Sequence, residues 1–163
     1  MKKIALITIG IIFLSIVACK KEPVETYYFN CKIDGQYFEP ENQGGLGEYP
    51  ITAKLLYDGI DLRIDVSKGI KNIFIAVRDS TKVKTQHYQL TNTPYKPTAI
   101  YDDNLDGNEY RTDSTSTGYV NLILLDEVSQ VIEGSFYFNA YNSVLNDTIQ
   151  ITDGKFKLKY TLH

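Results

Sequence analysis

The chain has 163 residues, of which 43% are hydrophobic and 12% aromatic, and its 17 basic and 20 acidic side chains give a net charge of −3 at pH 7. These values are typical of one globular domain, and they exclude a disordered polyampholyte and a protein with many membrane spans. The excess of acidic over basic side chains is not typical of a nucleic-acid-binding protein. Two cysteines and two histidines leave few ligands for a thiolate or imidazole metal site.

The N-terminal residues have the pattern of a secretory signal. Lys2 and Lys3 precede an apolar run over residues 4–18, which as a helix would span about 22 Å, less than the roughly 30 Å of a bilayer core. The run ends in Ile-Val-Ala-Cys at 16–19, which resembles the lipobox of bacterial lipoproteins, where the cysteine is acylated and becomes the new N-terminus. The pattern predicts a signal peptide over 1–18, lipid attachment at Cys19 and a charged tether over 19–26. An ordinary cleaved signal and an uncleaved anchor are the alternatives.

Lipidation would make the bilayer a partner of the protein through the acylated Cys19. It implies a location in the bacterial cell envelope, at the outer membrane, with the periplasmic and the surface face both open. Removal of the signal peptide leaves 15 basic and 20 acidic side chains, a net charge of −5. Cys31 is then the remaining thiol, and its place on the same side as Phe29 and Ile33 predicts a buried position in the core.

The rest of the chain alternates apolar and polar residues without a sustained 3.6-residue period, so we expect strands throughout. Asp-Gly favours two-residue type I′ turns, in which both central residues have positive φ. Four such pairs occur, at 34–35, 58–59, 106–107 and 153–154. A two-residue turn fixes the register of its strands, and in three cases the facing positions agree in polarity. The predicted apolar pairs are Cys31/Phe38, Phe29/Pro40, Tyr57/Ile60, Leu55/Leu62, Ala53/Ile64, Ile51/Val66, Ile151/Phe156 and Ile149/Leu158.

Further strands are predicted, in chain order, over residues 72–78, 84–90, 99–103, 109–113, 119–125 and 131–141. Irregular loops are expected at 43–47 and 91–97, where glycine or proline recurs. About ten strands in residues 27–163 predict a single all-β domain, either an antiparallel β-sandwich or a partly closed barrel built from hairpins.

Several strings along these strands carry a family resemblance. The strongest are Phe-Asn-Cys-Lys-Ile-Asp-Gly-Gln-Tyr-Phe at 29–38, Gly-Ser-Phe-Tyr-Phe-Asn-Ala at 134–140 and Ile-Thr-Asp-Gly-Lys-Phe at 151–156, with shorter matches at 88–91, 99–101 and 118–120. Over most of residues 27–160 the chain resembles a family of small uncharacterised lipoproteins of the Bacteroidetes type. The resemblance implies a β-sandwich domain of unknown function anchored at the envelope, and it supplies no catalytic residues.

One segment resembles a calcium-binding loop, in which side-chain oxygens at alternate positions surround a hard cation. The residues that match the pattern are Asp102, Asn104, Asp106 and Asp113. The last position is Asp instead of the usual Glu, and no flanking helices are predicted. The alternative is the fourth Asp-Gly hairpin, which would pair Asp102 with Arg111 and Asp103 with Tyr110 without a metal. No other cofactor is expected.

Thirteen tyrosines in a chain without tryptophan are a candidate stacking surface for sugars, because an exposed ring offers apolar contact and its hydroxyl a hydrogen bond. Packing is the alternative for most of them, since tyrosine is a common strand residue. Tyr28, Tyr37 and Tyr137 fall on the polar sides of their strands, and these are the candidate rings for ligand binding. His87 has no evident partner ligands and no catalytic motif is present, so no catalytic residue is predicted.

Asp-Ser/Thr triplets at 79–81, 113–115 and 147–149 resemble the acceptor of envelope O-glycosylation in Bacteroidetes, which predicts glycans at Ser80, Ser114 and Thr148. We expect a non-catalytic binding or interaction module, whose ligand is a glycan or a protein. A structural envelope component without a small ligand, and an enzyme acting on an extracellular polymer, are the alternatives. The oligomeric state is left open.

Overall fold

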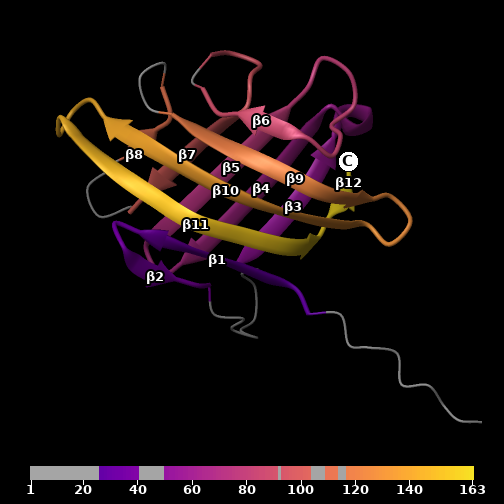
Figure 1. Ribbon diagram of the computed structural model, residues 1–163, viewed down its shortest axis with the longest axis horizontal. Coiled ribbons are helices and arrows are strands. Elements are labelled where there is room, and N and C mark those ends of the chain that lie inside the picture. The colour runs from indigo at the N-terminus through magenta and orange to yellow at the C-terminus, as the bar shows by residue number, and fades with distance from the viewer. Residues whose placement is uncertain (1–25, 41–49, 92, 104–108, 114–116) are drawn as a thin grey trace, which may run out of the picture.

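The computed structural model describes residues 26–40, 50–91, 93–103, 109–113 and 117–163 (Figure 1). They form twelve β-strands and one short 3-10 turn, η1 (Tyr57–Gly59). The strands are β1 (Tyr28–Ile33), β2 (Gln36–Phe38), β3 (Ile51–Leu56), β4 (Asp61–Lys68), β5 (Lys71–Arg78), β6 (His87–Gln89), β7 (Thr98–Asp102), β8 (Glu109–Arg111), β9 (Gly118–Asp126), β10 (Val131–Asn142), β11 (Asp147–Lys159) and β12 (Thr161–Leu162). The predicted all-β fold is confirmed, with twelve strands where about ten were expected.

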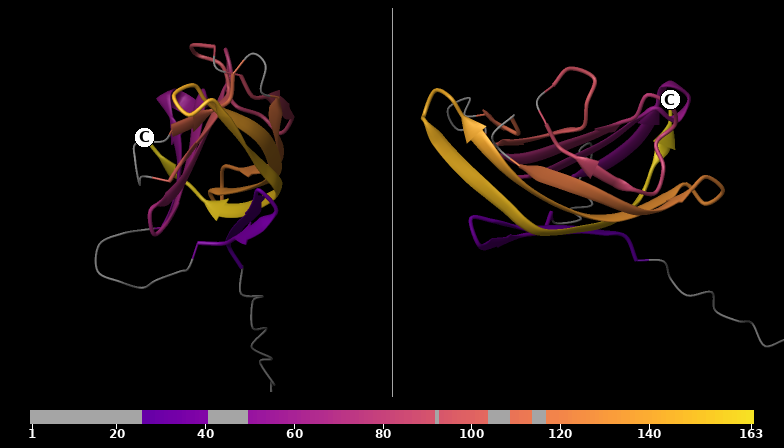
Figure 2. Two further views of the ribbon diagram at one scale, coloured as in Figure 1. Left: turned by 90° about the vertical axis from the view of Figure 1, so that its left-hand side faces the viewer. Right: turned by 45° about the horizontal axis from the view of Figure 1, so that its top comes forward.

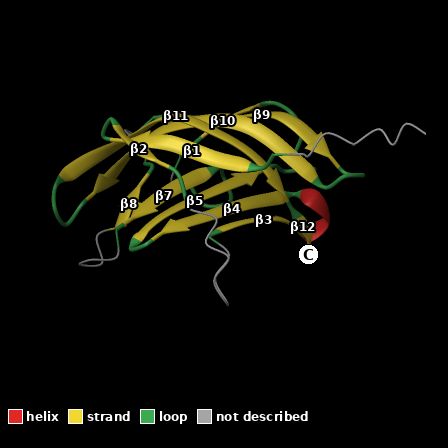
Figure 3. Cartoon of the chain, turned by 90° about the horizontal axis from the view of Figure 1, so that it is seen from below, coloured by secondary structure: helices red, strands yellow, loops and turns green. Residues whose placement is uncertain are grey.

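All twelve strands belong to one mixed sheet that is not closed. Its path runs β12-β3-β4-β5-β7-β8-β10-β11-β1-β2, while β9 pairs with β10 on one side and β6 on the other. The pairs are antiparallel except for β12 with β3. Figure 3 shows that the sheet folds over into a first layer of β12, β3, β4, β5, β7 and β8 and a second layer of β9, β10, β11, β1 and β2. Strand β6 extends the second layer through its pairing with β9. The two layers remain one open sheet because the end of β10 pairs with β8.

The core lies between the two layers, because each strand alternates apolar side chains inward with polar side chains outward. In β4, for example, Leu62 and Ile64 are fully buried while Asp65 is exposed. The largest fully buried side chains are Tyr160, Phe29, Phe136, Phe138, Phe156, Leu62, Ile64, Ile73, Ile75, Leu90, Leu122 and Ile132. Each such side chain stabilises the fold by about 1.5–3 kcal/mol relative to an exposed one.

Cys31 is part of this core and forms no disulfide. Burial raises the pKa of its thiol to about 12, so little reactive thiolate is present at neutral pH. The predicted buried position of Cys31 is confirmed.

Two of the predicted Asp-Gly hairpins are confirmed in register. Asp34 and Gly35 have φ of 47° and 78°, and Asp58 and Gly59 have φ of 57° and 94°, as a type I′ turn requires. The observed partners are Cys31 with Phe38, Leu55 with Leu62, Ala53 with Ile64 and Ile51 with Val66. In both hairpins the local turn chemistry and the polarity of the facing residues favour the same pairing.

The hairpin predicted at Asp153-Gly154 is wrong. Both residues lie inside β11, so the predicted pairs Ile151/Phe156 and Ile149/Leu158 are positions along one strand. The pair forms a β-bulge instead: Gly154 lies opposite Phe136 and Ile151 opposite Phe138, so two residues of β11 face the single residue Tyr137. Asp153 has the positive φ of 54° that such a bulge accommodates. Gly154 is required because a Cβ there would lie 2.6 Å from the Phe136 ring.

The register predicted around Asp106-Gly107 is also wrong. The observed partners are Ile100 with Arg111, Tyr101 with Tyr110 and Asp102 with Glu109, two residues away from the predicted pairing of Asp102 with Arg111 and Asp103 with Tyr110. The observed register is favoured by burial, because the rings of Tyr101 and Tyr110 both pack inward with centroids 6.0 Å apart. The predicted register would have placed Asp103 opposite the buried Tyr110. The connection therefore spans 103–108, of which 104–108 lie outside the described residues.

The start of β1, the β9–β10 turn and the C-terminus lie at one end of the domain, as Figures 1 and 2 show. Hydrogen bonds tie this end together, because the Tyr160 N–H donates to the Gln130 carbonyl over 2.9 Å and the His163 N–H donates to the Leu55 carbonyl over 3.0 Å. A segment that precedes β1 is therefore joined to the domain at this end.

Candidate binding face

The three tyrosines that sequence reasoning selected for binding all lie on the outward face of the second layer. Inward positions of β10 hold Phe136 and Phe138, so Tyr137 between them points outward. The strand registers place a line of outward residues across all six strands of this layer. This line, called the aromatic row, consists of Tyr37, Lys32, Thr152, Tyr137, Tyr119 and Gln89.

The centre of the aromatic row is a packed group of rings. Tyr119 lies directly opposite Tyr137, and their centroids are 5.2 Å apart in an edge-on arrangement. The His87 ring lies 4.7 Å from Tyr119 on the other side, and the Tyr137 hydroxyl shares a hydrogen bond of 2.9 Å with the Thr117 hydroxyl. Each such ring pair stabilises the folded protein by about 0.5–1.5 kcal/mol, which favours this arrangement of the rings. Tyr119 and Tyr137 are half-buried and His87 is exposed.

A second line of outward residues runs beside the aromatic row. This polar row consists of Asn30, Lys155, Ser135, Asn121 and His87, again one residue from each neighbouring strand. Amides, a hydroxyl, an ammonium and an imidazole supply both donors and acceptors of hydrogen bonds. The two rows together form a platform in which rings are bordered by polar groups.

Tyr37 and Tyr28 occupy the margins of this face. Tyr37 is 66% exposed and lies three strands from Tyr137, which is about 14 Å at the usual strand spacing. Its hydroxyl donates a hydrogen bond of 2.9 Å to Glu39, and this bond raises the pKa of the phenol. Tyr28 is half-buried, lies opposite Lys157 and points outward outside the aromatic row.

Sequence reasoning selected Tyr28, Tyr37 and Tyr137 but missed Tyr119, and it considered His87 only for a metal-binding or catalytic role. Alternation marks Tyr119 as an outward residue, because Val120 beside it is buried. The missing information was the strand order β6-β9-β10, which alone places His87, Tyr119 and Tyr137 side by side.

The other predicted sites lie elsewhere or outside the described residues. Ser80 and Thr148 are exposed, as glycosylation would require, while Ser114 is not described. Of the four candidate calcium ligands, Asp102 and Asp113 are described and half-buried, while Asn104 and Asp106 lie outside the described residues. The described part of the chain contains no group of three or more histidine, cysteine, aspartate or glutamate side chains placed to hold a metal ion.

The predicted signal peptide, Cys19 and nearly all of the tether also lie outside the described residues. Within the described ranges no helix has the length and apolar character needed to span a membrane.

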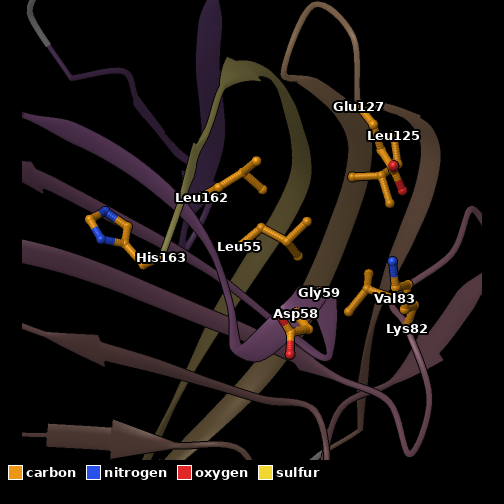
Figure 4. A pocket seen from close by; sticks show the side chains of 9 residues that line it. All are labelled: Leu55, Asp58, Gly59, Lys82, Val83, Leu125, Glu127, Leu162 and His163. Atoms are coloured by element: carbon orange, nitrogen blue, oxygen red, sulfur yellow. The ribbon is translucent and has the colours of Figure 1, made fainter.

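A pocket of about 450 Å³ lies at the end of the domain that carries the C-terminus (Figure 4). Its apolar wall and its charged rim come from η1, the segment after β5, the β9–β10 turn and the last two residues. The lining residues are Leu55, Asp58, Gly59, Lys82, Val83, Leu125, Glu127, Leu162 and His163. The His163 Nε2 lies 3.1 Å from the Thr161 hydroxyl, and the lining described here includes no serine, cysteine or threonine to act as a nucleophile. No sequence motif pointed to this pocket.

Comparison with known protein families identifies one family that matches the chain. A family described as Domain of unknown function (DUF6252) matches residues 26–158, which include β1 to β10 and nearly all of β11. The chain belongs to this family. The DUF6252 match therefore includes every residue of the aromatic row and the polar row. No curated protein and no solved structure matches the chain significantly.

Proposed function

We propose that this DUF6252 domain is a non-catalytic binding module, held at the bacterial envelope as a lipoprotein of the Bacteroidetes type through Cys19, and that it binds a glycan along the aromatic row. The observation that carries the proposal is the contact series of His87, Tyr119 and Tyr137 on an outward sheet face. Sugar rings have apolar C–H faces that stack on aromatic rings and hydroxyl groups that need polar neighbours. The aromatic row supplies the first and the polar row the second.

The shape of the face suits an extended chain of sugars. The rows cross neighbouring strands, which are spaced by about 4.8 Å, and they run from Gln89 in β6 to Tyr37 in β2. Binding along such a line requires no deep pocket, because successive rings of a polymer are contacted one after another. An open face of this kind fits a polysaccharide better than a single small sugar.

The acids on this face support a non-catalytic role. Glycoside hydrolysis needs two carboxyl groups about 5–10 Å apart across the bond that is cleaved. Three described acids lie beside the rows. Asp153 forms a 2.9 Å ion pair with Lys32, and Glu39 accepts a 2.9 Å hydrogen bond from the Tyr37 hydroxyl, so both carboxylates already have partners. Glu133 lies opposite Lys157, four residues along β11 from Asp153, which is about 13 Å.

The proposed anchor is compatible with this geometry. Residues 19–26 reach at most about 25 Å when fully extended, and they precede β1 at the end of the domain that carries the C-terminus. The aromatic row lies along the side of the second layer, so a short tether at the end leaves this side free to contact a polymer.

Binding is tested with the full lipoprotein in neutral lipid nanodiscs, screened against soluble polysaccharides by affinity electrophoresis. We expect retardation by at least one polymer, and we expect Tyr119→Ala and Tyr137→Ala each to weaken it about two- to tenfold. Tyr57→Ala removes a ring that is 64% exposed in the first layer and serves as the matched control, with unchanged binding. Retardation that is identical in all three variants would contradict the proposal.

The anchor is tested separately by labelling cells with an alkyne fatty acid. The wild-type protein should incorporate the label and Cys19→Ser should not. Protease treatment of intact cells, with a periplasmic protein as the leakage control, then tells whether the domain is at the surface. A protected domain that binds no glycan would favour the alternative of a structural envelope component.

A further inference from the structure

The outward side of β11 carries a line of positive charge. Phe156, Leu158 and Tyr160 are buried, so the residues that alternate with them point outward. The outward residues are Lys155, Lys157 and Lys159, spaced by about 6.6 Å along the strand. Lys32 of neighbouring β1 extends this lysine line on the same face, because it lies opposite Thr152.

Acids face two of these lysines but not Lys155. Lys32 is paired with Asp153 at 2.9 Å, and Lys157 lies opposite Glu133. Lys155 lies between the uncharged residues Asn30 and Ser135. Within the described part of the chain, the Lys155 ammonium makes no hydrogen bond or ion pair, although the whole protein carries a net charge of −3. Lys155 therefore places a positive charge beside the aromatic row of a protein whose net charge is negative.

We infer that the ligand of this face is an acidic polysaccharide, a chain that carries uronate carboxylates or sulfate esters. The inference rests on the proposed glycan-binding function and specifies its ligand class. Lys155 faces Ser135, two residues from Tyr137, so the Cα atoms of Lys155 and Tyr137 are about 8 Å apart. A sugar ring stacked on Tyr137 then has its acidic substituent within reach of the flexible lysine side chain. A charge-assisted hydrogen bond to that substituent is stronger than one to a neutral hydroxyl.

An anionic membrane surface is the competing partner for a lysine line. Around Lys155 the composition favours the polysaccharide, because its neighbours are rings, amides and hydroxyls, whereas membrane-binding faces present long apolar side chains for insertion. The exposed apolar residue Leu124 lies further along the face, in the row of Lys157. The same experiment separates the two partners.

The test uses the full lipoprotein in neutral phosphatidylcholine nanodiscs. Affinity is measured for polygalacturonate and alginate, each against its methyl-esterified neutral form, and for dextran sulfate against dextran. Co-flotation with phosphatidylglycerol vesicles is measured in parallel. We expect an acidic polymer to bind about tenfold or more tightly than its neutral counterpart, and we expect this preference to fall as salt rises.

Three lysine variants identify the group responsible. Lys155→Gln should lower affinity for the acidic polymer about tenfold and leave affinity for the neutral polymer unchanged. Lys155→Arg should retain the preference, and Lys71→Gln in the first layer, also an exposed lysine, should change nothing. Thermal unfolding of each variant confirms that it is folded.

The outcomes separate the inference from the function on which it rests. Equal binding of acidic and neutral polymers, lost in Tyr137→Ala and kept in Lys155→Gln, would overturn the inference and leave the glycan-binding function standing. Failure of every polymer to bind would overturn both. Vesicle binding that is lost in Lys155→Gln, without polymer binding, would assign the lysine line to the membrane instead.

Discussion

Gly154 of β11 is a position where a single added methyl group has no room. An ideal Cβ at Gly154 would lie 2.6 Å from three atoms of the Phe136 ring, well inside normal contact distance. The ring is 2% exposed, and its centroid is 5.1 Å from that of Phe29 and 6.3 Å from that of Phe156. Phe136 therefore has no space to move away without displacing these neighbours as well.

The expected cost of Gly154→Ala follows from two opposing effects. Relieving the contact requires a shift of about 1 Å in a packed core, and overpacking of this kind costs about 1–3 kcal/mol. Alanine also restricts the unfolded chain, which stabilises the folded state by about 0.4–1 kcal/mol. Gly154 does not have positive φ, so backbone strain adds nothing. The net loss is about 1–2 kcal/mol, or roughly 3–8 °C in Tm for a domain of this size.

Urea unfolding of four proteins measures this effect: the wild type, Gly154→Ala, Phe136→Leu and the double variant. We expect Gly154→Ala to be destabilised and the double variant to be more stable than the sum of the two single changes, because the smaller Leu side chain makes room for the methyl group. The reasoning is refuted if Gly154→Ala is as stable as the wild type, or if the two single changes simply add.

Three further outcomes are expected. Cys31 should resist iodoacetamide at pH 8 until the protein is unfolded, because burial raises its thiol pKa to about 12; rapid labelling of the native protein would contradict this. Asp61→Ala should cost about 3 kcal/mol in urea unfolding, because it leaves Arg63 and Arg78 without the 94% buried carboxylate they contact at 2.9 and 3.2 Å. Hydrogen bonds from Ser129 and Val128 lower the pKa of the Asp126 carboxyl, so its stabilisation is complete above about pH 4 and lost as pH falls through the folded pKa. The Tm difference between wild type and Asp126→Asn should therefore shrink under acid; a constant difference would argue against this.

Local sequence signals were sufficient where the turn alone determines the pairing. At Asp34-Gly35 and Asp58-Gly59 the two residues adopt the positive φ that the turn needs, and the strands on either side are consecutive in the chain. The same signal failed at Asp153-Gly154 because the glycine there is required by a residue far away in the sequence. Gly154 makes space for Phe136, a residue of the neighbouring strand, and nothing in the Asp-Gly pair itself distinguishes a bulge from a turn.

For the candidate site too, the sequence predicted local features but not the contacts between distant strands. Alternation with buried neighbours is enough to place Tyr137 on an outward face. Alternation does not reveal that β9 lies between β6 and β10. The contact series from His87 through Tyr119 to Tyr137 therefore could not be predicted from the sequence. Strand order is set by the packing of the whole core, and the residues that define a site across several strands are found only once that order is known.

The bulge connects the core to the candidate binding face. On the inner side Gly154 admits the Phe136 ring, and on the outer side the bulge places Thr152 and Asp153 opposite Tyr137, with Asp153 paired to Lys32 of the aromatic row. Phe136 and Tyr137 are consecutive, so a displacement of one moves the backbone that positions the other. A methyl group at Gly154 should therefore shift Tyr137 relative to Tyr119 even in the fraction of molecules that remains folded. For that reason we expect Gly154→Ala to weaken glycan binding by more than its loss of folded protein accounts for.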